Sequence, residues 1–395
     1  MKVLHLTNKP IFPVVDGGCV AMYRLLQSLL HLGYEVRNIT VETPKHPFDA
    51  KAFPERLAQI IRPEAFFIDT TVRAKDAFFS LFRKSSYNVD RFYDLGFEAM
   101  LVSELKKFNY GLIVLESAYL LPYVNCIRAN SNAKVIVRAH NIEYLIWERL
   151  AVAEIGILKG WFLKHLAKDL KKFELSALRT VDGIACISTT DQDLLQKAGI
   201  EIPMTTIPVS MELPALQESV AVPTDFFYLA SMNWRPNIEA VDWLIGEIFP
   251  AILQKIPQAR LHLAGSFMSE KLLKLSHPQI TVYGQVTDPK QFMAAHGILL
   301  SPLKSGSGVR IKVLEALALG IPVISTETGV EGIPVENGIS YLHAESAQDF
   351  AAAAATLVQN AEQRAAIGIR ARQLVAETYG LQPISNQFLA FLERL

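Results

Sequence analysis

Short apolar runs alternate along this chain with longer segments of helical periodicity, and no other feature limits its possible folds so strongly. Several runs are continuously apolar, as strands buried on both faces tend to be. Such alternation predicts parallel sheets covered by helices, and therefore an α/β protein. The strands expected in the first half are Val3–Leu6, Glu35–Thr40, Leu112–Leu115, Val135–Val137 and Gly183–Ile187.

The proline-containing stretch "EIPMTTIPVSMELPALQESVAVPTD" interrupts this rhythm and predicts a linker. The pattern then restarts, with a helix expected from Asn237 to about Leu253 whose apolar face is formed by Ile238, Val241, Ile245, Ile248 and Ile252. A chain of 395 residues also exceeds what one core usually holds. We therefore expect two Rossmann-like doubly wound domains, residues 1–205 and 206–375, and a C-terminal helix, residues 376–395, that returns to the first domain. The strands expected in the second domain are Phe226–Leu229, Leu261–Ala264, Thr281–Tyr283, Ile298–Leu300 and Val323–Ser325.

Composition excludes several classes of function. Lysine and arginine together number 39, as do aspartate and glutamate, so the chain as a whole is not attracted to nucleic acid. Its three cysteines are scattered, which predicts neither a metal site nor disulfides. The chain shows neither a signal-peptide core nor an apolar run of spanning length, so a cytoplasmic protein is expected. Two basic, aromatic segments, residues 73–93 and 153–179, allow for peripheral contact with the inner face of the membrane.

The stretch "SPLKSGSGVRIKVLEALALGIPVIS" combines a strand, a glycine-rich turn and a helix expected near Val309. Backbone amides at a helix N-terminus bind phosphate, and Arg310 and Lys312 add positive charge suited to a diphosphate. Glu315 fits neutral hydroxyls, such as those of a ribose or a sugar. The ligand that best satisfies this mixture is a nucleoside diphosphate carrying a sugar. The alternative is a turn before a helix whose charged residues are merely solvated.

Two further strand ends carry candidate residues. Gly17 and Gly18 open a helix after the first strand, without the G-x-G-x-x-G spacing of dinucleotide-binding proteins. Asp16, just before them, is suited to cap this helix. His140 follows the strand Val135–Val137 and could contact a substrate or be structural. The acidic triplet "DQD" at residues 191–193 fits the first turn of a helix better than a metal site.

Together these motifs resemble the family-4 glycosyltransferases, which are retaining enzymes of the group 1 type with the GT-B fold. The quoted stretches "VRAHNIE", "VDGIACISTTDQDLL", "LASMNWRPNIEAVDWL" and "GSGVRIKVLEALALGIPVISTETGVEGI" carry the resemblance, which extends through most of the chain. It implies two Rossmann-like domains facing a central cleft. It also implies a nucleotide-sugar donor held mainly by the second domain and a glycan or lipid-linked acceptor held mainly by the first. The implied reaction is hexosyl transfer with retained configuration and without a metal or a separate cofactor, in cell-surface polysaccharide biosynthesis.

The resemblance also implies roles for single residues. Arg310 and Lys312 would neutralise the leaving diphosphate, Glu315 would bind the ribose, and Gly308 would contact phosphate or sugar through its backbone. From the other domain, Gly17 and Gly18 would approach the same ligand and His140 would lie beside the transferred sugar.

This sequence departs from the family pattern at two points. Ser307 occupies a position where the family commonly has a glutamate that touches the donor sugar. The usual Arg and Lys after the first strand of the donor domain are also absent, and Arg235 is the nearest substitute.

Three alternatives stay open on sequence alone. A GT-B isomerase such as a nucleotide-sugar 2-epimerase would need a carboxylate cluster that the motifs do not show. A nicotinamide-dependent oxidoreductase would need the dinucleotide fingerprint. A nucleotide-sugar-binding protein without turnover finds its support in Ser307.

Overall fold

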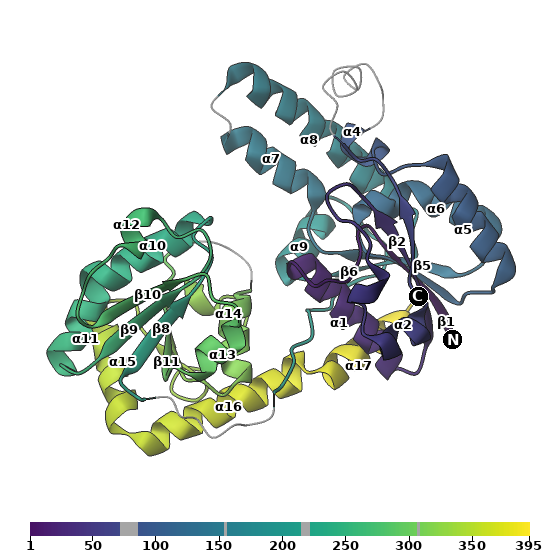
Figure 1. Cartoon of the computed structure of the whole chain (residues 1–395). Coiled ribbons are helices and arrows are strands. Elements are labelled where there is room, and N and C mark those ends of the chain that lie inside the picture. The colour runs from purple at the N-terminus through teal and green to yellow at the C-terminus, as the bar shows by residue number, and fades with distance from the viewer. Residues whose placement is uncertain (72–85, 154–155, 215–221, 306–308) are drawn as a thin grey trace. The chain divides into compact units, whose positions relative to one another are not determined.

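The computed structural model describes residues 1–71, 86–153, 156–214, 222–305 and 309–395. It divides the chain into two units (Figure 1). The first unit contains Met1–Ser210 and Leu381–Leu395, and the second contains Met211–Gly380. The chain thus crosses between the units after residues 210 and 380, where the sequence suggested boundaries at 205 and 375.

A parallel sheet with the strand order β3-β2-β1-β4-β5-β6-β7 forms the centre of the first unit. Neighbouring residues of β1, β4, β5 and β6 face opposite sides of the sheet and enter two separate cores. The strands are β1 (Lys2–Thr7), β2 (Glu35–Glu42), β3 (Glu64–Phe67), β4 (Leu112–Leu115), β5 (Lys134–Ala139), β6 (Gly183–Cys186) and β7 (Met204–Thr206).

Helices cover both faces of this sheet, as buried parallel strands require. On one face, α1 and α17 pack over alternate residues of β1, β4 and β5. On the other face, α5, α6 and α8 contribute to the second core. The helices are α1 (Gly17–His31), α2 (Glu55–Ile61), α4 (Tyr87–Asp90), α5 (Leu95–Lys107), α6 (Val124–Asn130), α7 (Glu143–Ala153), α8 (Ile157–Leu178), α9 (Thr189–Lys197) and α17 (Leu381–Leu392), with the short η1 (Ala50–Ala52) and η2 (Ala118–Tyr123).

The second unit repeats this plan, with the strand order β10-β9-β8-β11-β12-β13. One face packs against α10, α11 and α15, and the other against α13, α14 and α16. Its strands are β8 (Asp225–Leu229), β9 (Arg260–Ala264), β10 (Ile280–Gly284), β11 (Ile298–Ser301), β12 (Val323–Ser325) and β13 (Leu342–His343). Its helices are α10 (Arg235–Trp243), η3 (Leu244–Ile248), α11 (Phe249–Lys255), α12 (Glu270–Leu273), α13 (Pro289–Ala294), α14 (Ile311–Ala318), η4 (Thr328–Val330), α15 (Ala347–Gln359) and α16 (Ala361–Tyr379).

The fold class expected from sequence is confirmed, because both units are parallel sheets covered by helices. The expected linker was wrong at its start, where β7 pairs in parallel with β6. The adjacent Pro203 still accepts a hydrogen bond through its carbonyl from the Ile184 backbone N–H, at 3.0 Å. Proline is tolerated at a sheet edge because only one side of the strand needs donors.

The helix expected from Asn237 begins two residues earlier, at Arg235, and contains the π-helical turn η3. That turn changes the phase of the apolar face, because a π-turn holds more residues than an α-turn. Val241, Ile248 and Ile252 are buried as expected, whereas Ile238 is exposed.

Candidate functional site

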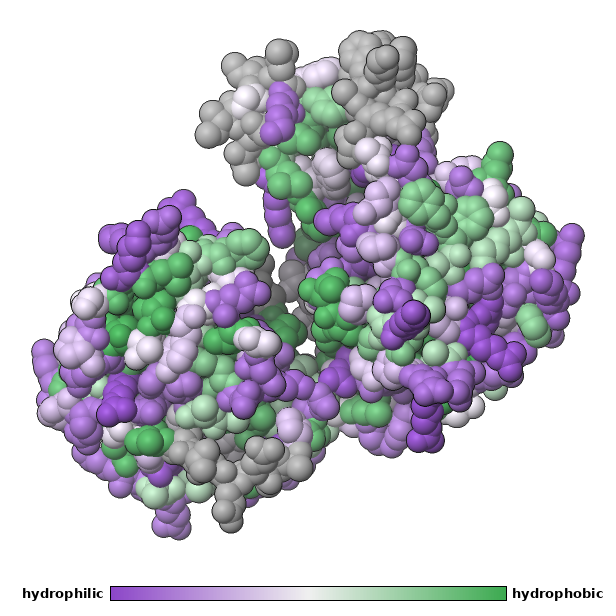
Figure 2. Space-filling model, in the orientation of Figure 1, coloured by the Kyte–Doolittle hydropathy of each residue, from purple (hydrophilic) through white to green (hydrophobic). Residues whose placement is uncertain are grey.

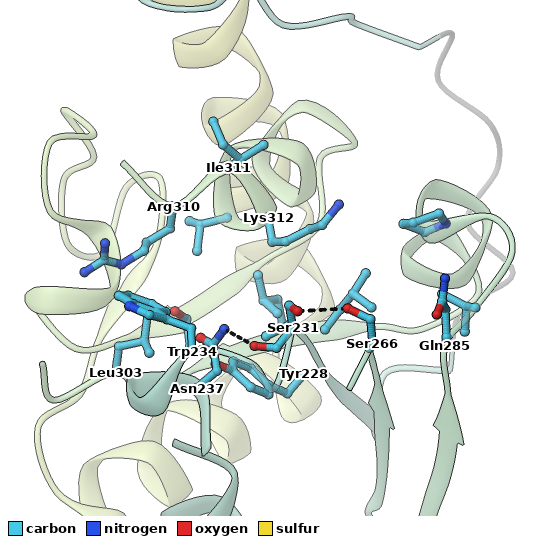
Figure 3. A pocket seen from close by; sticks show the side chains of 18 of the residues that line it. Tyr228, Ser231, Trp234, Asn237, Ser266, Gln285, Leu303, Arg310, Ile311 and Lys312 are labelled. Carbon is cyan, nitrogen blue, oxygen red and sulfur yellow. Dashed lines mark hydrogen bonds between the residues drawn. The ribbon is translucent and has the colours of Figure 1, made fainter. Parts of the chain in front are cut away.

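A cavity of about 540 Å³ opens at the carboxyl edge of the second sheet (Figure 3). This is where open parallel sheets bind ligands, and the volume lies in the range of small-molecule sites. Residues that follow β8, β9 and β10 form part of its wall, and the N-terminal turn of α14 forms another part. The lining residues are Tyr228, Leu229, Ala230, Ser231, Trp234, Asn237, Gly265, Ser266, Gln285, Val286, Pro289, Leu299, Ser301, Leu303, Val309, Arg310, Ile311, Lys312 and Val313.

A row of hydrogen-bonded side chains forms one side of this cavity. The Tyr228 hydroxyl donates to Asn237 Oδ1 at 2.9 Å, and Asn237 Nδ2 donates to the Ser231 carbonyl at 2.8 Å. The hydroxyls of Ser231 and Ser266 are 2.8 Å apart. Each polar group is therefore held by its neighbours, so the wall keeps its shape for a ligand that makes further hydrogen bonds to it.

Gly265 permits the close packing of two strand ends behind this row. Its φ of +149° lies in a region that side chains rarely adopt, and a Cβ atom there would lie 1.7 Å from the Ala230 carbonyl oxygen. Only glycine fits this position. The loop after β9 is thus held against the loop after β8, which brings Ser266 to Ser231.

Arg310 lies immediately before α14, as the helix N-cap residue, on the side of the cavity opposite the hydrogen-bonded row (Figure 3). Its guanidinium lies over the Trp234 ring, with 5.2 Å from Cζ to the ring centroid. Arg310 Nη2 also lies 3.4 Å from the Thr328 carbonyl oxygen and 3.8 Å from Glu331 Oε2. Burial lowers the pKa of Arg310, and the nearby Glu331 carboxylate opposes that shift. The result is a mostly buried cation at a cavity wall, a residue suited to bind an anion.

Lys312 and Glu315, which the sequence predicted to act together, form an ion pair with 2.6 Å between Lys312 Nζ and Glu315 Oε2. Lys312 lines the cavity, whereas Glu315 lies one turn further along α14. In the described part of the chain, no side chain caps the N-terminus of α14. The backbone amides of its first turn therefore retain donor capacity beside Arg310 and Lys312, a combination that suits phosphate.

The other residues predicted to bind the nucleotide-sugar donor do not all line this cavity. Arg235 is 88% exposed, pairs with Glu239 at 2.8 Å between Nε and Oε1, and is not among the lining residues. Ser307 and Gly308 lie outside the described residues. The part of the motif that the structure describes therefore consists of Arg310, Lys312 and Glu315.

In the first unit, Gly17 and Gly18 open α1 as expected. Asp16 caps this helix by accepting a hydrogen bond from the Cys19 backbone N–H at 2.9 Å, and Lys9 Nζ lies 2.7 Å from Asp16 Oδ1. Burial would raise the pKa of Asp16, but the hydrogen bonds from Lys9 and Cys19 outweigh it and lower the pKa to about 2. Apart from its two chain neighbours and the nearby backbone of α1, no described atom lies within 4 Å of the position that a Gly17 Cβ would take. The protein's own packing therefore does not explain the glycine at position 17.

His140 directly follows β5 and belongs to a network that sequence reasoning missed. The buried Glu116, which follows β4, accepts a hydrogen bond from His140 Nε2 at Oε2 and another from His5 Nε2 at Oε1, both at 2.6 Å. Burial alone would raise the pKa of Glu116, but the hydrogen bonds with His140 and His5 outweigh it and hold that pKa well below its usual range. One carboxylate thus joins histidines that lie 135 positions apart in the sequence.

The network determines the tautomers of both histidines. An ionised carboxylate only accepts hydrogen bonds, so each Nε2 must carry a proton. His5 Nδ1 is buried and has no hydrogen-bond partner among the described residues. In His140, Nδ1 is the ring nitrogen not used by Glu116, and the side chain keeps a small exposed area. His140 can therefore offer Nδ1 to a ligand while Glu116 fixes the ring.

The polar row of Tyr228, Ser231, Asn237 and Ser266 was also missed. The available signal was the position of Ser231 and Ser266 just after an apolar run and of Asn237 near the start of the next helix, whereas Tyr228 lies within β8. The Gly265-Ser266 pair directly after β9 was the clearest such sign. The triplet at residues 191–193 is in the first turns of α9, as expected, where Asp191 follows the cap Ser188.

Comparison with known proteins identifies the second unit. Residues 223–360 match the family model described as Glycosyl transferases group 1. Over 393 residues the chain is also 22% identical to an uncharacterized 44.6 kDa protein in the cps region of Klebsiella pneumoniae, covering 96% of both chains.

Solved structures share the fold of the whole chain. HepE of Anabaena in complex with UDP has a TM-score of 0.64 at 15% identity, over 100% of both chains. Sucrose-phosphate synthase of Thermosynechococcus elongatus has a TM-score of 0.64 at 16% identity, over 100% of this chain and 99% of that one. A TarM variant of S. aureus, in complex with fondaparinux, alpha-GlcNAc-glycerol and UDP, has a TM-score of 0.61 at 12% identity, over 99% of each chain.

Among the residues that the structure describes, no helix is long and apolar enough to cross a membrane. The same residues contain no group of three or more His, Cys, Asp or Glu side chains that could hold a metal ion. The match identifies residues 223–360 as a domain of the group 1 glycosyltransferases, and the whole chain has the GT-B fold of these solved structures.

Proposed function

We propose that this enzyme transfers a hexose from a nucleoside-diphosphate sugar to a glycan or lipid-linked acceptor, with retention of the anomeric configuration. One observation carries the proposal: the cavity of the second unit combines a structured polar wall with two cations at the N-terminal turn of α14. A nucleoside supplies a flat ring and hydroxyls for the wall, and a diphosphate supplies charge for the cations.

Arg310 and Lys312 are proposed to stabilise the departing diphosphate. Negative charge develops on that group as the sugar bond breaks, and fixed cations stabilise it without having to reorganise during the reaction. Glu315 is proposed to accept hydrogen bonds from the ribose. Lys312 engages its Oε2, so among the described contacts Oε1 stays available as an acceptor.

The other predicted residues complete the proposal. Gly308 is proposed to contact phosphate or sugar through its backbone, and Ser307 to face the donor sugar. Gly17 and Gly18 are proposed to let the ligand approach α1 closely, and His140 to hydrogen-bond the transferred sugar. Arg235 would serve only if its ion pair with Glu239 opened.

The known proteins suggest which ligands to try first. HepE was solved with UDP, with UDP and glucose, and with UDP-glucose, so UDP-sugars are the first donors to test here. The Klebsiella relative is a protein of the cps region, which favours a surface polysaccharide as the product. The TarM complex with alpha-GlcNAc-glycerol supports an acceptor that bears hydroxyl groups.

The test is turnover with a panel of UDP- and GDP-sugars and with lipid-linked and free saccharide acceptors. The proposal predicts acceptor-dependent release of one nucleoside diphosphate, and a product whose anomeric proton coupling in NMR matches that of the donor. A product of inverted configuration would overturn the retaining mechanism. A changed sugar still attached to its nucleotide would instead establish an isomerase, and donor binding without turnover of any acceptor would favour a binding protein.

A further inference from the structure

The helices α7 and α8 lie side by side and extend away from the sheet of the first unit (Figure 1). One side of α8 is packed: Leu166 is buried beside Tyr87, and Trp147 and Phe162 pack against them. Glu174 of α8 accepts hydrogen bonds from the backbone N–H groups of Glu143 and Tyr144, at 3.1 and 2.9 Å, and so holds the start of α7. The rotation of α8 about its axis is therefore fixed, and its opposite side faces outward.

The outward side carries Lys164, Lys168 and Lys172, all exposed. Their spacing of four residues places them in one row along the helix. Trp161 precedes Lys168 by two helical turns and lies on the same side, where it is 60% exposed and stacks on His165 with 6.0 Å between ring centroids. We call these three lysines and Trp161 the lysine face.

The charges of the lysine face are not neutralised within the described part of the helix pair. Every described acidic side chain of α7 and α8 is engaged elsewhere: Asp169 pairs with His165 at 3.2 Å, and Glu148 pairs with Lys171 at 3.5 Å. Glu143 accepts a hydrogen bond from Tyr119, and Glu174 is buried. Across the described residues, no ion pair involves Lys164, Lys168 or Lys172. An ordinary solvated helix surface would instead alternate lysines with acids four residues apart.

Exposed apolar side chains lie at the same end of the helix pair as Trp161. Leu150 and Val152, in the last turn of α7, are 50% and 80% exposed. In the view of Figure 2, the end of the helix pair that extends from the first unit carries hydrophobic and hydrophilic residues beside each other. A tryptophan and aliphatic side chains next to a row of cations form the combination that rests in the headgroup region of a bilayer.

We propose that the lysine face, with Leu150 and Val152, docks this enzyme on an anionic lipid bilayer. The three lysines contact headgroup phosphates, and Trp161 and Val152 enter the interfacial layer. Nucleic acid is the less suitable partner, because it offers no apolar layer for the exposed tryptophan and valine. The proposal does not depend on which sugar the enzyme transfers.

The test is flotation of the full-length protein with phosphatidylcholine vesicles that do or do not contain phosphatidylglycerol. Each lysine near such a surface strengthens binding about fivefold, so Lys164→Gln, Lys168→Gln and Lys172→Gln combined should weaken binding about a hundredfold. Added salt should weaken the wild type strongly, because exposed charges are screened. Trp161→Ala should weaken binding while leaving its salt dependence intact.

The matched control replaces three other exposed lysines of the first unit, Lys106, Lys107 and Lys197, by Gln. It should bind the vesicles like the wild type, and thermal unfolding should show that all variants are folded. Equal binding to vesicles with and without phosphatidylglycerol would overturn the proposal. So would a lysine-face variant that binds like the control, or wild-type binding to polyglutamate or DNA as strong as to the anionic vesicles.

Discussion

Glu116 is the residue on which the geometry of His140 depends. Its two carboxylate oxygens each hold one histidine at 2.6 Å, and both contacts are out of reach of solvent or nearly so. The fully buried Arg138 belongs to the same region: burial lowers its pKa, and the Glu116 carboxylate opposes that shift. Glu116 is therefore a positioning residue for His140. Carboxylates that hydrogen-bond to metal-binding histidines orient the imidazole ring in the same way in other proteins.

Glu116→Gln tests this role. The amide keeps one acceptor oxygen but turns an N–H₂ group toward the other histidine, so one buried Nε2–H loses its acceptor. We expect stability to fall by about 1–3 kcal/mol. We also expect kcat to fall about 10- to 100-fold with little change in the donor KM, because the loss of a carboxylate that orients a metal-binding histidine has an effect of this size in other proteins.

The matched control for that variant is Glu104→Gln. Glu104 is another buried carboxylate of the first unit and accepts a hydrogen bond from Tyr110 at 2.5 Å. It should lose stability but keep kcat. If steady-state kinetics gave the same kcat for folded Glu116→Gln and for the wild type, the positioning role would be excluded.

Residues next to an apolar run were predictable from sequence, and their distant partners were not. His140, Gly17 and Arg310 stood out because each lies at the end of a recognisable strand or the start of a helix. Glu116 and His5 reach His140 only because β4 lies between β1 and β5 in the sheet. Strand order is a property of the packed fold, and a periodic pattern does not contain it.

Among the elements, the pair of α7 and α8 has a built-in dependence on pH. Burial raises the pKa of Glu174 to about 7, although the backbone N–H groups of Tyr144 and Glu143 oppose the shift by donating to its carboxylate. A carboxyl group whose pKa is raised on folding binds protons more tightly in the folded state. Its contribution to stability is therefore fully present below the unfolded pKa and is lost as pH rises through about 7.

Glu174→Gln should remove this dependence. Between pH 5 and pH 7 the wild type should lose on the order of 1.4 kcal/mol per pH unit relative to the variant. Urea unfolding at pH 5 and pH 8 measures the difference, and Glu148→Gln, a part-exposed carboxylate of the same helix pair, is the control. A gap between wild type and Glu174→Gln that stays constant across this range would contradict the assigned pKa.

The elements found from sequence were those with long apolar runs. All ten expected strands correspond to observed strands, whereas β3, β7 and β13 were missed. All three are edge strands: β3 and β7 form the two edges of the first sheet, and β13 forms one edge of the second. They are short and only partly buried. An edge strand needs fewer apolar residues, and its pattern is correspondingly weak.

At the scale of the whole molecule, the C-terminal helix α17 belongs to the first unit, which is otherwise built from the N-terminal part of the chain. Phe388 and Phe391 of α17 are fully buried and pack in one core with residues of α1 and β1. Gly183 of β6 leaves room for this helix, since a Cβ there would lie 2.7 Å from the Phe391 ring. The first unit is therefore incomplete until the end of the chain has been made.

Phe388→Ala should destabilise the first unit by about 3–5 kcal/mol, the usual cost of emptying a buried phenylalanine site. The cavity in the second unit should retain its nucleotide affinity, because all its lining residues lie between Tyr228 and Val313. Urea unfolding followed together with nucleotide binding separates these effects, and the exposed Gln387→Ala is the control. Comparable stability of the two variants would show that α17 does not support this core.

The cavity at the N-terminal turn of α14 is proposed to bind the nucleoside diphosphate of the donor. Calorimetric titration of the full chain with UDP and GDP tests it most directly, with Arg310→Ala beside Arg370→Ala, an exposed arginine of the same unit. One nucleotide should bind to the wild type and to Arg370→Ala alike. Loss of a charge-assisted contact worth about 1.5–3 kcal/mol should weaken its binding to Arg310→Ala by about 10- to 100-fold. Undiminished affinity in Arg310→Ala, or binding of neither nucleotide to the wild type, would contradict the claim.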